Sequence, residues 1–509
     1  MNLSIDRRLL RKLALFSIAA ALPVAMSAQQ NKKTSSPPPK APAKSSTPSQ
    51  RPSTPTNGNR PNTPNGNRSN TMTNSNRSNM NGNRPNANAN RPNANGNRPN
   101  TSATARGNMA APGRQVTLRG GGSASIRPNG QIRSVSRNGM TINRGMHGGR
   151  VVVSVHNNVR IVNVGRGGGY VQRAYFARGG RSYYSRTYYV HGVYRVGVYR
   201  GYYWGGRPYY GYYPGFYYHP VYYGWAYNPW PAPVYYGWGW GAAPWYGYYG
   251  PAYYQPYPVY PAAYFWLTDW MIAANLQAAY AAQAEANAEL LPLTPDPTLV
   301  ASLMPLAAAD APKVAMTKEV KDALAEEVKA VLASEQTDAS KPKGSSGGGQ
   351  SPATSNTPPP ALDPNFKTFV VSSDSSLVAN GDECALSQGD VIERTSDTPD
   401  SDGNVTVKVV ASTKNDCAIG KEGPISSDDL QEMYNSFRDS LKDGMGELAK
   451  KNGSGGLPKA PDTSTSDSDV PPPPADKTAQ KTLDDQQSAA DQTETEVKQE
   501  AGSGSGGGR

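Results

Sequence analysis

Residues 151–164 read VVVSVHNNVRIVNV, in which two runs rich in β-branched residues flank the pair Asn157-Asn158. Asparagine tolerates the positive backbone angles of tight primed turns, so this stretch predicts a β-hairpin. The pairs Asn129-Gly130 and Asn138-Gly139 are turn signals of the same kind a little upstream. We therefore expect a small antiparallel sheet within a basic β-hairpin region, residues 114–200.

Short alternating runs continue on both sides of the hairpin. Residues 124–143 are expected to pair beside it, and residues 170–176 and 186–194 to add edge strands. From 201 to 262 the sequence becomes a mosaic of Tyr, Gly, Pro and Trp, with a proline every few residues. Proline interrupts both helices and central strands, so we expect this low-complexity segment to be extended, turn-rich and only partly ordered.

The first residues have the pattern of a secretory signal. Positive residues between Arg7 and Lys12 precede an apolar run from Leu13 to Met26, and small residues follow. The run is too short for a permanent anchor, so we expect a signal peptide, residues 1–28, and a mature protein without a transmembrane segment. An uncleaved anchor helix is the alternative. Either way, the protein is expected to be exported to the periplasm, the outer surface or the extracellular space.

Polar, low-complexity segments make up much of the remaining chain. In residues 29–113 the motif N-x-N-R-[PS]-N recurs six times, centred on Arg60, Arg68, Arg77, Arg84, Arg91 and Arg98. This repeat has almost no apolar residue to bury, which predicts a flexible, positively charged tether. Composition likewise predicts a flexible linker in residues 336–361 and a disordered tail in residues 453–509.

Helical periodicity appears in three places. Within the helical segment 263–335, one helix is expected from about 263 to 291 and a second from 317 to 334, with apolar residues recurring from Val320 to Val331. A third helix is expected after Ser426 and Ser427, which are capping candidates, with an apolar face from Leu430 to Leu448.

Residues 362–452 read as a small all-β module closed by that third helix. Short runs of Val, Ile, Phe and Thr are separated by turns such as Asn380-Gly381 and Asp402-Gly403. Together with Gly389-Asp390, which leads into a strand, they resemble a bacterial SH3-like small barrel over about 90 residues. The resemblance implies the fold, and such modules bind cell-wall peptides or protein partners. No ligand site is carried over from it.

The two cysteines, Cys384 and Cys417, both lie in this module. An exported protein meets an oxidising environment, so one intradomain disulfide is favoured over two buried free thiols. A redox pair would be expected to have the closer C-x-x-C spacing. The expected fold class is therefore a mostly disordered, low-complexity chain with a small all-β module and its helix, a short β-hairpin region and two helices.

Charge gives the strongest chemical signal. Between Arg7 and Thr268 there is no Asp or Glu, and from Ser45 to Thr268 all 24 positive residues are arginine. A soluble domain normally intersperses both signs, so this run favours an anionic partner. Arginine makes bidentate contacts to phosphate, sulfate or carboxylate and stacks on aromatic rings. An alternative of equal weight is compositional drift in an envelope filler whose charge serves only solubility.

Ten arginines are the candidates for contact with an anionic polymer: Arg150, Arg160, Arg166, Arg173, Arg178, Arg181, Arg186, Arg195, Arg200 and Arg207. The expected partners are an anionic polysaccharide, lipopolysaccharide or a wall polymer, with self-association through arginine and tyrosine and binding of DNA as further options. Tyr and Trp rings between Gly and Pro could also stack on sugars.

The residue types needed for catalysis are scarce. The four histidines, His147, His156, His191 and His219, lack metal-ligand spacing, and the sequence has no nucleophile elbow, P-loop or dinucleotide fingerprint. We expect no catalytic, metal or cofactor site. The favoured function is an envelope or matrix scaffold that binds anionic polymers through the acid-free region and a partner through the module. The alternatives are extracellular nucleic-acid binding and, less favoured, a wall-modifying enzyme.

Overall fold

The computed structural model describes residues 113–164, 168–190, 193–290, 314–341 and 357–503. All of them belong to one of the two compact units of the chain. The expected signal peptide, the repeat tether up to residue 112 and Arg166 lie outside the described residues.

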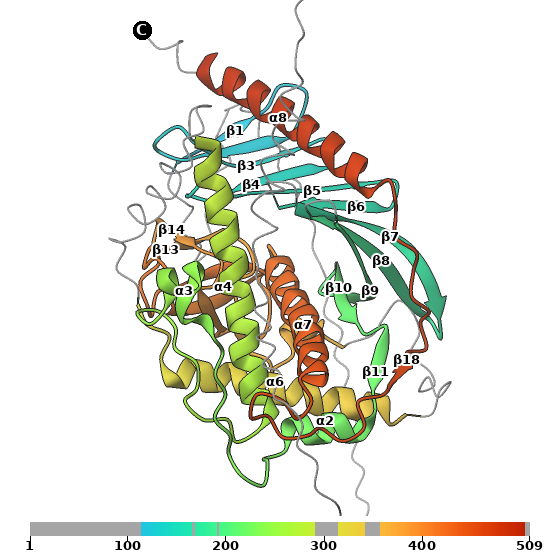
Figure 1. Ribbon diagram of the computed structural model, residues 1–509. Coiled ribbons are helices and arrows are strands. Elements are labelled where there is room, and N and C mark those ends of the chain that lie inside the picture. The colour runs from blue at the N-terminus through green and yellow to red at the C-terminus, as the bar shows by residue number, and fades with distance from the viewer. Residues whose placement is uncertain (1–112, 165–167, 191–192, 291–313, 342–356, 504–509) are drawn as a thin grey trace, which may run out of the picture. The chain divides into compact units, whose positions relative to one another are not determined.

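A ten-stranded antiparallel sheet dominates the described part, and its strands follow one another in chain order from β1 to β10 (Figure 1). The strands are β1 (Arg114–Thr117), β2 (Ser123–Ile126), β3 (Ile132–Arg137), β4 (Met140–Arg144), β5 (Arg150–His156), β6 (Val159–Asn163), β7 (Gly168–Arg178), β8 (Arg181–Val190), β9 (Val193–Trp204) and β10 (Arg207–Tyr213). Each connection between neighbours is short, as expected of a meander.

The predicted hairpin is confirmed as β5 and β6. Asn157 and Asn158 join these strands with φ of 50° and 61°, the left-handed conformation that the turn requires. The sheet is larger than predicted, because β7, β8 and β9 lie in its interior and it extends past residue 200 to Tyr213. Pro208 is the one proline between residues 168 and 213, and it lies on the edge strand β10, where proline is tolerated.

The segment rich in Tyr, Gly, Pro and Trp differs from the predicted, partly ordered state. It contributes the end of β9, then β10, β11 (Phe216–Tyr218), α2 (Pro220–Tyr227), the 3₁₀ turn η1 (Trp240–Ala242) and α3 (Pro244–Tyr249). Pro220 and Pro244 begin their helices, a position where the missing N–H costs nothing. Many of its rings are fully buried, among them Tyr222, Tyr253 and Tyr260.

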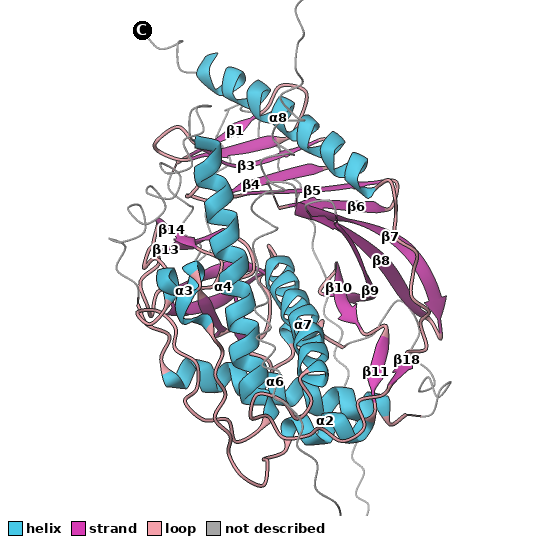
Figure 2. Ribbon diagram, in the orientation of Figure 1, coloured by secondary structure: helices cyan, strands magenta, loops and turns pink. Residues whose placement is uncertain are grey.

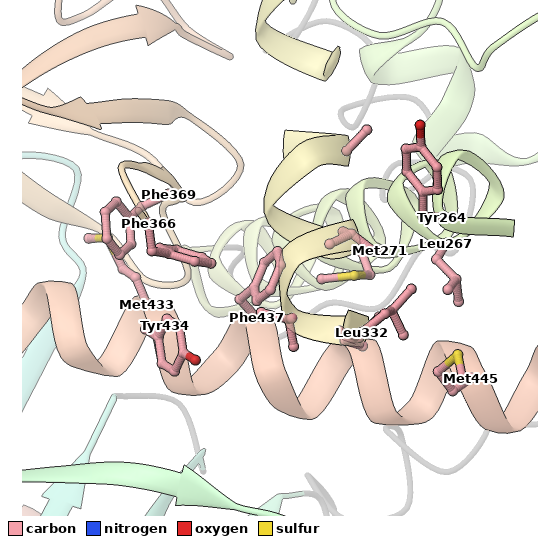
Figure 3. Close-up of a cluster of buried hydrophobic side chains, with 14 of the residues drawn as sticks. Tyr264, Leu267, Met271, Leu332, Phe366, Phe369, Met433, Tyr434, Phe437 and Met445 are labelled. Atoms are coloured by element: carbon pink, nitrogen blue, oxygen red, sulfur yellow. The ribbon is translucent and has the colours of Figure 1, made fainter. Parts of the chain in front are cut away.

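The predicted helices are present, with slightly different ends. They are α4 (Ala263–Leu290), α6 (Lys318–Ala339) and α7 (Ser427–Lys450), and Ser426 caps α7 by accepting from the N–H of Asp428. α6 continues to residue 339, into the region predicted as linker. Figure 3 shows side chains of the core that these helices share, including Met271 of α4, Leu332 of α6 and Phe437 of α7.

The predicted β module consists of two small sheets. β12 (Thr368–Val370), β15 (Val391–Arg394), β16 (Asn404–Ala411) and β17 (Glu422–Ser426) form a four-stranded sheet, while β13 (Ser375–Ala379) and β14 (Asp382–Leu386) form a separate hairpin. A single closed small barrel is not seen, so the SH3-like fold stays a prediction. A disulfide joins Cys384 of β14 to Cys417, 33 residues further on.

The described part of the predicted tail, residues 453–503, differs most from the predicted disorder, and residues 504–509 lie outside the described residues. Its strand β18 (Thr465–Asp467) pairs with β11, and its helix α8 (Ala479–Ser503) runs across the large sheet against β3, β5, β6, β7 and β8 (Figure 2). Leu483, Ala490 and Val497 of α8 are buried against the sheet. We call residues 462–501 the C-terminal strap.

Candidate anion-binding face

The arginines of the large sheet meet acids from the second half of the same chain. Of the 39 acidic residues, 38 lie at or after Asp269, so the sheet itself has none. Eight of its arginines nevertheless form ion pairs, all with carboxylates between residues 383 and 500. These arginines are Arg127, Arg133, Arg137, Arg144, Arg150, Arg173, Arg186 and Arg195.

The C-terminal strap supplies one group of these carboxylates. Glu494 of α8, whose side chain is 5% exposed, accepts from Nε of Arg144 at 2.6 Å and from its Nη2 at 2.5 Å, which is a bidentate contact. Arg150 pairs with Asp491 and also approaches Glu494. Arg173 binds Asp476 at 2.8 Å. The strap therefore presents carboxylates to the sheet in the way that a bound polyanion would.

Helix α7 supplies a second group, in which the partly exposed Glu432 meets a buried arginine. Arg186 is fully buried and donates to both oxygens of Glu432, at 2.6 and 2.9 Å, and to Gln172 at 2.7 Å. Its guanidinium also lies 4.2 Å from the ring centre of Tyr170 and 3.9 Å from that of Tyr199. Burial alone would raise the pKa of Glu432, but the charge and hydrogen bonds of Arg186 outweigh burial and lower it.

The β module is the third source of carboxylates for the sheet. Glu383 of β14 accepts from Arg127 and Arg133, each at 2.8 Å, and its side chain is 5% exposed. Burial would raise the pKa of this carboxyl, but the hydrogen bonds and charges of the two arginines hold it at about 2.

The other candidate arginines form no ion pair within the described residues. Arg160 is half-buried near Tyr170 and Glu432. Arg207 lies against Gly403, so closely that a Cβ added to Gly403 would lie 2.5 Å from the guanidinium carbon of Arg207. Arg178, Arg181 and Arg200 lie near one end of β7, β8 and β9. Arg166 falls outside the described residues.

Helix α7 also covers the edge of the sheet at β10. The buried amide of Asn435 accepts from the backbone N–H of Tyr212 at 2.8 Å and donates to the backbone oxygen of Tyr210 at 2.8 Å. An open edge exposes such groups to pairing with other chains. Asn435 therefore satisfies two backbone groups of the edge strand that a neighbouring strand would otherwise pair.

Buried carboxylates away from the sheet are held by hydrogen bonds within the chain. Asp269 of α4 accepts from the hydroxyls of Tyr254 and Tyr260, at 2.7 and 2.6 Å, and from the N–H of Tyr257. These bonds anchor the tyrosine-rich segment to α4. Burial raises the pKa of Glu327 of α6 to about 7, although hydrogen bonds from the backbone N–H groups of Lys367 and Thr368 lower it in part. These two hydrogen bonds connect α6 to β12.

Two of the described histidines lie beside aspartates from the second half of the chain. Nε2 of His147 lies 2.8 Å from Asp416, and Nε2 of His219 lies 3.9 Å from Asp462 while its Nδ1 accepts from the N–H of Val221 at the start of α2. Within the described ranges no three His, Cys, Asp or Glu side chains are grouped as metal ligands would be. In the same ranges no helix has the length and apolar character needed to cross a membrane.

The acids of the strap are the residues that sequence reasoning missed. Composition alone marks the tail as disordered, yet Leu483, Ala490 and Val497 recur every seven residues, and Asp491 and Glu494 lie three apart. That spacing is typical of a helix and could have predicted α8.

In comparisons with protein-family models, curated proteins and solved structures, no match to this chain was found.

Proposed function

We propose that this protein is an exported scaffold of the bacterial cell envelope or extracellular matrix that binds anionic polymers through its arginine-rich region. The observation that supports the proposal is the bidentate capture of carboxylates by arginines of the sheet, as in the contact between Arg144 and Glu494. The same donor geometry suits the carboxylate, sulfate or phosphate groups of a polysaccharide, lipopolysaccharide or wall polymer.

The internal ion pairs restrict which arginines are available to such a polymer. Those that face Glu432, Glu383 or the strap have their counter-ions within the chain. External contacts are then left to the arginines without ion pairs and to the repeat from Arg60 to Arg98. In this proposal the β module docks a protein or wall partner, and the protein has no catalytic role.

Extracellular nucleic-acid binding is the second candidate. Arginine stacked on tyrosine, as where Arg200 lies 4.7 Å from the ring centre of Tyr202, is a contact that also suits phosphate and bases. A preference for single-stranded DNA over an acidic polysaccharide of similar charge density would favour this candidate.

Binding of the full chain to a polyuronate, to lipopolysaccharide and to DNA, each at about 50 and 200 mM salt, tests the proposal. We expect capture of the polyuronate or lipopolysaccharide that weakens by an order of magnitude or more at the higher salt, because arginine contacts release counter-ions. Binding that ignores salt, or no binding to any polymer, would contradict the proposal. Turnover of peptidoglycan by the purified protein would replace it with a catalytic function.

A further inference from the structure

The turn between β7 and β8 places two arginines directly opposite each other. Gly179 and Gly180, with φ of 55° and 72°, form the turn, and Arg178 pairs across it with Arg181. Cross-strand partners project on the same face, and like charges in that position repel. Glycine adopts this pair of positive φ angles without steric cost, so the turn places both arginines at one end of the sheet.

A third arginine joins them on that face. Arg200 of β9 pairs with Tyr183 of β8, which is two residues from Arg181, and side chains two apart share a face. Arg200 lies over the ring of Tyr202, and its buried Nε has no hydrogen-bond partner. We call Arg178, Arg181 and Arg200 the hairpin patch.

The strap passes this patch without neutralising it. Arg178 donates to the backbone oxygen of Asp469 at 3.1 Å, but the carboxylate of Asp469 is bound by the hydroxyl of Tyr213. The next strap residues, Val470 and the prolines 471–474, have no charge, and Val470 packs on Tyr183. Among the described residues, no carboxylate forms an ion pair with any arginine of the patch, in contrast to the eight paired arginines of the same sheet.

We infer that the hairpin patch binds the acidic groups of an anionic polysaccharide. These groups supply the negative charge that the strap does not place beside the patch. This inference rests on the proposed function and assigns it a site. The rings beside the patch favour a polysaccharide over single-stranded nucleic acid, because Tyr183 is buried and Tyr202 is covered by Arg200. Tyr183 therefore offers no open face for a base, and Arg200 occupies one face of Tyr202, whereas the guanidiniums can still reach acidic groups.

The test compares the full-length protein with two triple variants that lose the same charge. One is Arg178→Gln, Arg181→Gln and Arg200→Gln. The control, Lys318→Gln, Lys341→Gln and Lys450→Gln, removes three exposed positive charges that lie outside the large sheet. Alginate, a polyuronate, and a single-stranded oligodeoxynucleotide are the probes, at about 50 mM salt. We expect the patch variant to lose about tenfold or more in affinity for alginate and the control to lose less than about threefold, since three specific contacts are removed only in the first.

The outcomes separate the site from the function. If the wild type binds alginate and both variants weaken equally, charge acts diffusely and the hairpin patch is wrong while the proposed function stands. If the wild type binds no polyanion, both fail. A loss confined to the oligonucleotide would replace the polysaccharide with nucleic acid. Urea unfolding of the patch variant should be unchanged or slightly more stable, because like charges are removed, and a clear destabilisation would assign these arginines a structural role instead. The single variant Arg178→Gln, at an exposed position, repeats the test with the smallest perturbation.

Discussion

Replacing Glu432 with Gln removes the charge that faces Arg186 between the sheet and α7. The guanidinium of Arg186 is fully buried, while the side chain of Glu432 is 30% exposed. At an effective dielectric constant of about 20, two unit charges about 4 Å apart attract by roughly 4 kcal/mol, and breaking a buried pair costs about 3–5 kcal/mol. The hydrogen bond to Gln172 and the two tyrosine rings remain, and Glu432 is partly solvated. We therefore expect a loss of roughly 2–3 kcal/mol in the free energy of unfolding.

Urea unfolding of the full chain, followed by tyrosine and tryptophan fluorescence, measures this loss as a lower midpoint with an unchanged slope. The control is Glu326→Gln on α6, which breaks an exposed pair with Lys329 and should cost about 0.5 kcal/mol or less. Adding salt should weaken the small effect of the control more than that of Glu432→Gln, because the buried charge of Arg186 is poorly screened. A Glu432→Gln protein within about 0.5 kcal/mol of wild type would refute the reasoning.

Further predictions concern single groups. The pKa of Glu383 is about 2, below its unfolded value, so its contribution of roughly 3 kcal/mol to the free energy of unfolding is present above pH 4.5 and lost as pH falls toward 2. The difference in stability between wild type and Glu383→Gln should therefore vanish over that range. A difference that stays constant would argue against the arginine contacts. The pKa of Glu327 is raised to about 7, so wild-type stability should fall as pH rises from 4.5 to 7. Glu327→Gln should abolish this pH dependence, and an identical pH profile in the variant would contradict the prediction. Asn435→Leu leaves two backbone groups of β10 unpaired and should cost about 2–4 kcal/mol by thermal unfolding, whereas a neutral effect would show that β10 finds other partners. Replacing Cys384 and Cys417 with Ser should cost about 3–4 kcal/mol, because the disulfide closes a 33-residue separation; an unchanged midpoint under reducing conditions would oppose this.

Local periodicity was enough to predict several elements of the fold. The alternation around Asn157-Asn158 predicts β5 and β6, and apolar spacing predicts α4, α6 and α7. These signals depend on residues close together in the sequence, which is why they can be read without tertiary information.

Elements held by distant contacts could not be read in this way. Proline density in residues 201–262 suggests partial order, but Tyr254 and Tyr260 are fixed by hydrogen bonds to Asp269. Composition assigns the tail to disorder because its stabilising partners lie elsewhere, as Glu494 and Arg144 are 350 residues apart. For such segments, tertiary contacts override local preference.

The site for an anionic partner stays a prediction. The acid-free run of arginine indicates an anionic partner, and arginine does bind carboxylates bidentately in the sheet. Sequence could not show that many of those carboxylates belong to the same chain. Nor could it show which arginines are left without a counter-ion, because that depends on the path of the strap past Arg178 and Arg181.

The central claim is that the arginines of the sheet order the acidic tail of their own chain. Hydrogen–deuterium exchange of the full-length protein at low salt tests it most directly, with the double variant Arg144→Gln and Arg150→Gln as the comparison. We predict that the amides of α8 are protected at least about tenfold in the wild type and clearly less in the variant, since the variant loses the ion pairs to Asp491 and Glu494 while Leu483, Ala490 and Val497 stay buried. An α8 that exchanges at the unfolded rate in the wild type, or that stays equally protected in the variant, would contradict the account.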